Sequence, residues 1–347
     1  MISLFTSLLV AAAANITLTA DNIPEVVSAL TLEEKVRLIV GYSDGMAKAA
    51  GDVGINSRTQ MGAAGATSPI ERLGIPSIIL ADGPAGLRIN PEREGENRTF
   101  YCTGFPIGTL LSSSWNTEMI REVGEAMGNE VLEYGVDILL APGVNLHRNP
   151  LCGRNFEYYS EDPLISGMMA GYTSKGLAKY GVYAYAKHFA LNEQEKNREN
   201  LYCWASEQAI REIYARGFEH YVNLGGLGLM TAFNKVGSYW AGASEALCTT
   251  LLREEWGFHG VVVTDYCYQS TMGANVGLRA QNDLWLLKNS TYGASYAYNQ
   301  TPHDGLKLLR RASKNILYAC AHSNNVWTLE DYQAVGIDEI IKATDRS

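Results

Sequence analysis

Long basic runs are missing from this sequence of 347 residues, whose formal net charge is −9. Lysine and arginine never occur more than two in a row, so the charge pattern that binds nucleic acid or an anionic lipid surface is missing. Downstream of the first 14 residues, no stretch approaches the ~20 uninterrupted apolar residues of a membrane span. We therefore exclude polyanion binding as the main function, and we predict no nucleic-acid partner and no membrane span.

Motifs for metals and nucleotides are missing as well. The six cysteines include no Cys-X-X-Cys pair, and the six histidines show no pairing at ligand spacing. Neither a GxGxxG nor a GxxxxGK turn occurs, which disfavours a nucleotide-binding open sheet. We predict no cofactor, and a metal-dependent hydrolase is the weakest of the functional hypotheses.

The composition favours one large domain with a substantial core. Hydrophobic residues make up 46% of the chain, and 34 glycines suggest many tight turns. A single α/β barrel commonly uses about 250 residues or more, which fits this length. The 20 tyrosines and six tryptophans supply flat amphipathic surface that suits sugar rings, although most of them are expected to pack in the core.

The amino terminus is typical of a secretory signal. Residues 1–14 are apolar and end in four alanines, which resembles a hydrophobic region followed by a small-residue cleavage site. Asn-X-Ser/Thr sequons are compatible with glycosylation. These sequons are Asn15, Asn97, Asn289 and Asn299. We therefore expect a secreted glycoprotein or a protein of the secretory or lysosomal route.

Helical and strand patterns alternate along the chain. A capping box at Thr31–Glu34 opens the first helix, and Ser244 and Gly257 suit the two ends of a later one. The other predicted helices are 117–135, 164–178, 206–224 and 306–321, with a further one near 336–343, and the predicted strands are 75–80, 136–141, 182–186, 228–232, 260–264 and 282–287. This alternation predicts an α/β fold, a TIM-type (β/α)8 barrel with an irregular or incomplete strand set.

Polar residues follow several of the predicted strands. They are Asp82, Arg154, Lys187, His188 and Asp265. The carboxyl ends of barrel strands meet at one mouth, so these side chains are expected to share a pocket. Carboxylates beside Arg, Lys and His can hold sugar hydroxyls through charge-assisted hydrogen bonds. Taken singly, each residue has an alternative role as a structural ion pair or a helix cap.

Four motifs carry a resemblance to a known family. Residues 82–88 read DGPAGLR, 153–163 read GRNFEYYSEDP, 187–198 read KHFALNEQEKNR and 256–266 read WGFHGVVVTDY. In this order they resemble glycoside hydrolase family 3 on its β-glucosidase side, over residues 21–322, with 323–347 as a tail. The chain does not resemble the N-acetylglucosaminidase branch, because the loop after His188 lacks that branch's glycine-flanked histidine.

The resemblance implies an exo-acting, retaining β-glycosidase whose nucleophile is Asp265 and whose substrate is a β-glucoside or an oligosaccharide. Asp265 must stay ionised to attack, and nearby cations are expected to depress its pKa. Tyr266 would form an aromatic wall, and Phe233 stands where the family more often has a tyrosine, so one polar contact is lost. The residues implied to bind the non-reducing sugar are Asp82, Arg154, Lys187 and His188.

The acid/base of the reaction is harder to identify. The family usually takes this glutamate from a second α/β domain, which we expect this chain to lack. Within the barrel the weak candidates are Glu157, Glu193 and Glu195, although Glu157 and Glu195 are better suited to ordering Arg and Lys side chains. We expect the acid from a second chain or segment. The alternative is a carbohydrate-binding barrel with little or no turnover.

Two cysteines are expected to flank the pocket. Cys102 and Cys152 fall on loops beside the predicted mouth, where a disulfide would rigidify the sugar site in a secreted protein. Separate, buried cysteines are the alternative.

Overall fold

The computed structural model describes residues 16–40, 62–92, 97–267, 272–286 and 302–323. The predicted signal, the sequons Asn15, Asn289 and Asn299, residues 324–347 and the helix near 336–343 lie outside the described residues.

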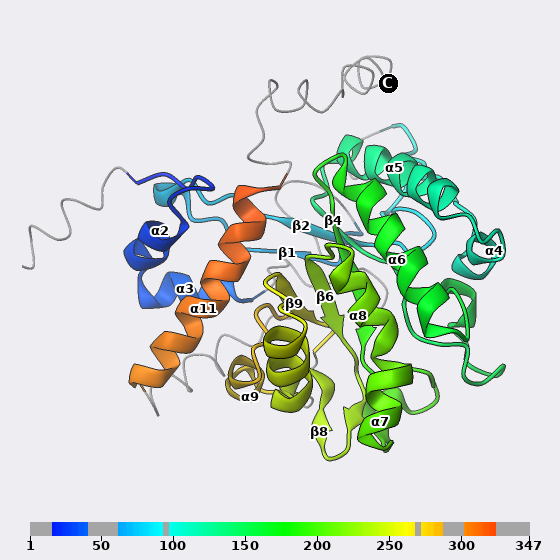
Figure 1. Cartoon of the computed structure of the whole chain (residues 1–347). Helices are drawn as coiled ribbons and strands as arrows, with labels where there is room; N and C mark the ends of the chain where they lie inside the picture. The colour runs from blue at the N-terminus through cyan, green and yellow to red at the C-terminus, as the bar shows by residue number, and fades with distance from the viewer. Residues whose placement is uncertain (1–15, 41–61, 93–96, 268–271, 287–301, 324–347) are drawn as a thin grey trace, which may run out of the picture.

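A curled sheet of six strands forms the centre of the molecule, in the order β1-β2-β3-β4-β6-β9 (Figure 1). The strands from β2 to β9 run parallel, whereas β1 pairs with β2 in the antiparallel direction. The strand bounds are β1 Gly65–Ala66, β2 Ile79–Asp82, β3 Ile138–Leu140, β4 Tyr183–Phe189, β6 Gly228–Thr231 and β9 Val261–Thr264. The prediction of an α/β barrel with an incomplete strand set is confirmed.

Beyond β9, within the described residues, the sheet continues through single bridges, in which Leu284 pairs with Val263 and Trp285 with Val40. The strand predicted over 282–287 is therefore not regular within its described part. Asn282 donates from Nδ2 to the Leu284 carbonyl at 3.1 Å, and the Asp283 carboxylate accepts from the Val262 amide at 3.0 Å. The Asp283 side chain thus accepts a bond from Val262 that a regular ladder would give to a backbone carbonyl.

A small second sheet lies in the loops after β4 and β6. Its order is β5-β7-β8, with bounds Tyr202–Cys203, Lys235–Val236 and Tyr239–Trp240. Lys235 Nζ lies 4.0 Å from the ring centroid of Tyr202 and 4.1 Å from that of Trp240. Cation–π contacts on two strands therefore stiffen this sheet.

Helices cover the central sheet on two flanks (Figure 1). One flank carries α5, α6 and α8, and the other carries α2, α3 and α11. The helix bounds are α2 Ile23–Ala29, α3 Leu32–Leu38, α4 Gly108–Ser112, α5 Thr117–Glu133, α6 Pro163–Ala178, α7 Glu207–Ala209, α8 Arg216–Asn223, α9 Ala274–Arg279 and α11 Pro302–Ala321. Two π-helical segments, η5 Ile210–Tyr214 and η7 Ala246–Glu255, and the 3₁₀ turns η2 Glu71–Leu73, η3 Asn155–Glu157, η4 Arg198–Asn200 and η6 Ala241–Ala243 complete the set.

Side-chain caps begin several helical segments, and the caps at Thr31 and Ser244 were predicted from the sequence. Thr31 and Glu34 form the reciprocal capping box of α3. Asp162 accepts from the Leu164 amide at 2.7 Å to start α6, and Ser244 Oγ accepts from the Leu247 amide at 3.3 Å ahead of η7. The predicted helix 206–224 is divided into α7, η5 and α8, because a π turn interrupts the regular hydrogen bonds.

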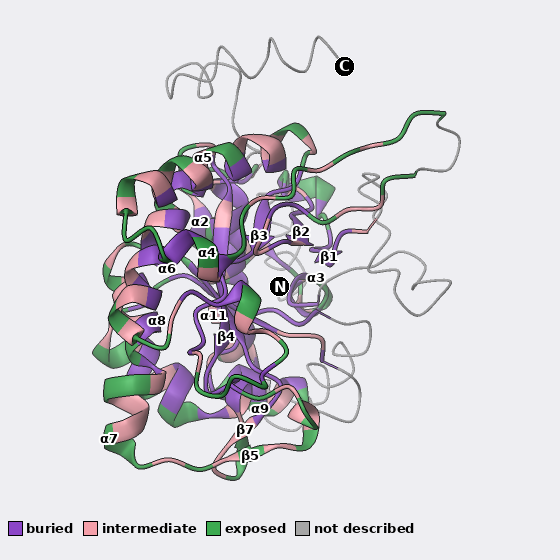
Figure 2. Cartoon of the chain, turned by 90° about the vertical axis from the view of Figure 1, so that its right-hand side faces the viewer, coloured by how far each residue is buried: buried purple, intermediate pink, exposed green. Residues whose placement is uncertain are grey.

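The core lies between the strands and the inward faces of the helices (Figure 2). All four residues of β9 are buried, as expected for a parallel strand covered on both faces. Each buried Val of such a strand stabilises the fold by about 1.5–3 kcal/mol. At Gly176 of α6, a Cβ would lie only 2.3 Å from the Arg121 carbonyl of α5, so the close packing of these helices requires glycine.

Candidate active site

The carboxyl ends of the parallel strands converge on a cavity of about 330 Å³. Asp82 ends β2, Lys187 and His188 lie near the end of β4, and Asp265 follows β9 directly. Arg154 reaches the same space from the turn before η3. The structure thus brings together all residues predicted to bind sugar or to attack it: Asp82, Arg154, Lys187, His188, Phe233, Asp265 and Tyr266.

Asp82 and Lys187 form an ion pair inside this cavity. Lys187 Nζ lies 2.5 Å from Asp82 Oδ1, and Arg88 lies 3.5 Å from Oδ2. Burial raises the pKa of Asp82, but the charge and hydrogen bond of Lys187, together with the charges of Arg88 and Arg154, bring the pKa below its ordinary value. The site therefore presents a fixed carboxylate and an ammonium group side by side, which suits neighbouring hydroxyls of one sugar.

The Asp265 side chain is held by the backbone of the next residue and faces His188. Its Oδ1 accepts from the Tyr266 amide at 2.7 Å, and its Oδ2 lies 3.6 Å from His188 Nε2. Burial raises the pKa of Asp265 despite the opposing charges of Lys187 and Arg154. The cations lower this pKa, as expected, but desolvation of the carboxylate is the larger effect, so the net shift is upward and not downward.

His188 is a neutral member of the site. Burial, together with the charges of Arg154 and Lys187, holds the pKa of His188 well below its usual range. Its backbone amide donates to Asn145 Oδ1 at 2.7 Å, and its Nδ1 lies 3.3 Å from the Tyr158 hydroxyl. These contacts fix the ring, so that Nε2 points to Asp265 and the cavity.

The three glutamates considered as acids lie in different places. Glu157 lines the Asp265 cavity, but its carboxylate is paired with Arg154. Glu195 accepts from Arg198 at 2.7 Å, and both Glu195 and Glu193 line a neighbouring cavity rather than that of Asp265. Glu157 and Glu195 are thus bound to guanidinium groups.

Two arginines of this cavity belong to the sequence motifs but were not predicted as site residues. Arg88 and Arg198 both line the space around Asp265. Arg198 also stacks on Phe233, with its guanidinium carbon 4.4 Å from the ring centroid. Their position in motifs that follow strand ends could have indicated a role in the site. The sequence does not predict the path of each loop, however, and that path decides where the arginine points.

Tyr266 closes one side of the cavity. Its hydroxyl donates to the Ala64 carbonyl at 2.8 Å, which joins the end of β9 to the sheet edge before β1. The ring is thereby fixed beside the nucleophile candidate.

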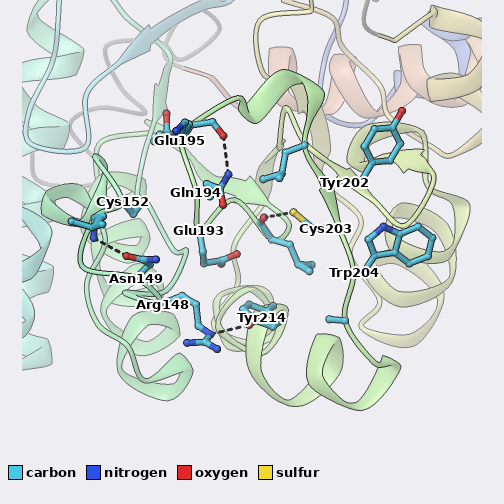
Figure 3. Close-up of a pocket in the computed structure, with 15 residues that line it drawn as sticks. Arg148, Asn149, Cys152, Glu193, Gln194, Glu195, Tyr202, Cys203, Trp204 and Tyr214 are labelled. Carbon is cyan, nitrogen blue, oxygen red and sulfur yellow. Dashed lines mark hydrogen bonds between the residues drawn. The ribbon is translucent and has the colours of Figure 1, made fainter.

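A second, larger cavity of about 640 Å³ lies next to the first and contains Cys152 (Figure 3). Cys102 instead packs against the apolar cluster around β2 and β3. The two cysteines thus have different surroundings, and the disulfide between them stays a prediction. Within the described part of the chain, no three His, Cys, Asp or Glu side chains gather to hold a metal ion, and no helix there is long and apolar enough to cross a membrane.

Comparison with known families gives one clear match. The family described as "Glycosyl hydrolase family 3 N terminal domain" matches residues 55–292. The chain is 44% identical to "Beta-glucosidase A" of Butyrivibrio fibrisolvens over 198 residues, which are 57% of this chain and 23% of that protein. It is 37% identical to "Beta-glucosidase" of Ruminococcus albus over 265 residues, 73% of this chain and 27% of that protein.

A solved structure agrees with this match. The structure of β-glucosidase 3B from Thermotoga neapolitana in complex with glucose aligns with a TM-score of 0.82 and 41% identity. The alignment covers 94% of this chain and 46% of that one. The matched region therefore spans about a quarter of the length of the curated relatives, 23% and 27% respectively. It spans under half of the length of the solved structure.

Proposed function

The chain belongs to glycosyl hydrolase family 3, and from this premise we propose that it acts in the hydrolysis of β-glycosidic bonds at the non-reducing end of a β-glucoside. The observation that carries the proposal is the cavity of Asp265, where a half-buried carboxylate lies with Lys187, Arg154 and His188. A space of about 330 Å³ suits one bound sugar. The glucose held by the related Thermotoga enzyme agrees with this size.

The proposed reaction retains the configuration of the sugar. An oxygen of Asp265 forms a bond to the anomeric carbon while the bond from that carbon to the leaving oxygen breaks. Water then cleaves the resulting ester, and the carboxylate is regenerated. His188 is neutral and His188 Nε2 lies 3.6 Å from Asp265 Oδ2, so a proton on Nε2 can orient the carboxylate without removing its charge.

The leaving oxygen must receive a proton, and retaining enzymes place the acid about 5–5.5 Å from the nucleophile. Glu157 shares the Asp265 cavity but is paired with Arg154. We therefore propose that a second chain or a further segment supplies this acid. Without that acid, the chain by itself should hydrolyse glucosides of good leaving groups much faster than glucosides of poor ones.

An activated substrate tests the proposal directly. The chain is mixed with 2,4-dinitrophenyl β-glucoside, whose leaving group needs no proton, and with a matched glucoside of a poor leaving group. We expect a burst of dinitrophenol and, with the 2-fluoro analogue, a covalent label on Asp265 seen by peptide mass spectrometry. Asp265→Asn is the matched control.

No label and no burst would leave only the carbohydrate-binding alternative and refute the proposal. Equal turnover of good and poor leaving groups would refute the external acid while keeping Asp265 as the nucleophile.

We also propose that the protein is secreted. The support is the apolar segment 1–14 and the sequon at Asn97, which is exposed. Expression in a secreting eukaryotic host, with mass spectrometry before and after peptide N-glycosidase, should show processing near residue 14 and a sugar on Asn97. An unprocessed chain retained in the cells would contradict it.

A further inference from the structure

Glu193 is one of the three glutamates considered as the acid, but its contacts give it a different role. It lines the second cavity and is only 8% exposed (Figure 3). Its Oε1 accepts from Asn145 Nδ2 at 3.1 Å and from the Leu146 amide at 3.4 Å. Asn145 is fully buried and lines neither this cavity nor that of Asp265. The carboxyl group of Glu193 therefore holds a side chain that lies behind the wall of the second cavity.

Asn145 in turn binds both polar backbone groups of His188. Its Oδ1 accepts from the His188 amide at 2.7 Å, and its Nδ2 donates to the His188 carbonyl at 3.1 Å. Next to it, the Val144 amide donates to the Lys187 carbonyl at 2.7 Å, so the segment after β3 lies alongside the end of β4. His188 Nε2 lies 3.6 Å from Asp265 Oδ2. A displacement of the Asn145 amide group would therefore move the His188 ring relative to the attacking carboxylate.

Glu193 fixes the direction in which the Asn145 amide group points. An amide group has one donating end and one accepting end. Glu193 Oε1 accepts from the Leu146 amide, so it pairs with the donating end of Asn145. The accepting end is then turned to the His188 amide. Without an acceptor at position 193, the buried NH₂ group of Asn145 loses one of its partners, which destabilises this arrangement of the side chain.

The charge of Glu193 is not needed for this role. Both hydrogen bonds go to Oε1. Burial raises the pKa of Glu193 to about 7, so a large fraction of the group carries a proton near neutral pH. A proton on Oε2 leaves Oε1 able to accept both bonds. The neutral amide of glutamine can therefore replace the carboxyl group.

We propose that Glu193 is a positioning residue of the active site, which acts through Asn145 to hold His188 against Asp265. This role rests on the proposed function, in which Asp265 attacks the sugar. It also connects the two cavities, because a group that lines the second one sets the geometry of the first.

Covalent labelling of Asp265 measures this role. With 2,4-dinitrophenyl 2-fluoro-β-glucoside, the concentration dependence of labelling gives the binding constant of the sugar and the rate constant of attack separately. Glu193→Met keeps the length of the side chain but lacks the acceptor. Its rate constant should fall by at least about tenfold, because small misplacements of reacting groups cost large factors in rate. The binding constant should change little, since the ion pair of Asp82 and Lys187 is retained.

Three further variants control for effects on the fold. Glu193→Gln keeps the acceptor and should be labelled at a rate within about threefold of the parent chain. Glu193→Ala removes volume together with the acceptor and should behave like Glu193→Met, whose place it takes if that variant does not fold. Gln194→Ala removes an exposed neighbour that lines the same cavity and donates to the Lys196 carbonyl at 2.9 Å, and it should match the parent.

Nitrogen NMR of the histidine rings gives a readout without any sugar. The chain is labelled with ¹⁵N-histidine, and His188→Gln assigns the ring signals of His188. We expect these signals to move in Glu193→Met and to stay in place in Glu193→Gln. His322, whose Nδ1 lies 2.8 Å from the Tyr318 carbonyl, is the internal control and should not move in either variant.

Any of three results would overturn the proposal. They are labelling of Glu193→Met as fast as that of the parent, equal slowing in Glu193→Gln and Glu193→Met, or His188 signals that do not move in Glu193→Met. Absence of labelling in the parent chain would instead refute the proposed hydrolysis, and the His188 signals would still decide whether Glu193 positions the ring.

Discussion

An aspartate lies at each end of the parallel sheet, fully buried at one end and half-buried at the other, and their surroundings differ. At the amino end, Asp283 is fully buried and uses both oxygens: Oδ2 accepts from Arg253 at 2.6 Å and from the Val262 amide at 3.0 Å, and Oδ1 accepts from Asn315 at 3.0 Å. At the carboxyl end, Asp265 accepts one backbone bond at Oδ1, and its Oδ2 faces His188 and the cavity.

The difference in pairing suits Asp283 to a structural role and Asp265 to a catalytic one. The bonds of Asp283 join β9, η7 and α11, so its desolvation is offset by complete pairing. Asp265 lacks such pairing, and burial raises its pKa. An ionised carboxylate left in that condition destabilises the fold but is available to a substrate.

Asp265→Asn should produce the largest effect. Without a nucleophile, kcat on 2,4-dinitrophenyl β-glucoside should fall by a factor on the order of 10⁴. The folded protein binds the Asp265 proton more tightly than the unfolded chain does, so the stability from this group is complete at low pH and is lost as pH rises through the raised pKa. Asparagine does not ionise, so this loss of stability does not occur in the variant. Its Tm at neutral pH should therefore equal or exceed that of the parent chain. A marked fall in Tm would contradict the contrast with Asp283.

Asp283→Ala should do the opposite. Removing one partner of a buried ion pair leaves Arg253 uncompensated, and the free energy of unfolding should drop by about 3–5 kcal/mol. Urea denaturation measures this drop, and activity per folded molecule should not change. Asp21→Ala, at an exposed position, is the control and should change stability by less than about 0.5 kcal/mol. An equally small effect at Asp283 would break the comparison.

The pH dependence of kcat/KM reports the direction in which the Asp265 pKa is shifted. The attack requires the ionised form, so kcat/KM should fall about tenfold for each pH unit below the Asp265 pKa. Because burial raises this pKa, the acid limb should lie above the ordinary value of 3.8. In Arg198→Gln one opposing cation is removed, and the limb should move further upward. A limb at or below 3.8 would show that the cations dominate after all.

Phe233→Tyr should have the smallest effect. A hydroxyl added on the ring beside Arg198 gives the carboxyl end one more hydrogen bond, which should raise kcat/KM by roughly two- to tenfold. Phe105→Tyr is the control, since Phe105 packs against the cluster around β2 and β3 and does not line the Asp265 cavity. Equal rates in both variants would show that the family's usual tyrosine does not assist here.

The sequence predicted the strand ends well because each one combines an apolar run with a polar residue. Asp82, Lys187 and Asp265 were placed by that pattern, and the barrel geometry then brought them together. The caps at Thr31 and Ser244 were also predictable, since capping depends on residues close in sequence.

Features that depend on long-range packing were not predictable in this way. The direction of the Asp265 pKa depends on how fully the folded chain excludes water, which the nearby cations do not reveal. The roles of Arg88 and Arg198 depend on loop paths, and the second cavity depends on two loops meeting. The irregular segment after β9 follows from competition by side chains.

The ion pair between Glu195 and Arg198 also bears on how this protein can evolve. Glu195 lines one cavity and Arg198 lines the other, so a single pair forms part of both walls. A substitution at either position would therefore alter the two cavities together without altering any strand of the sheet, and selection on either cavity would act on the same loop.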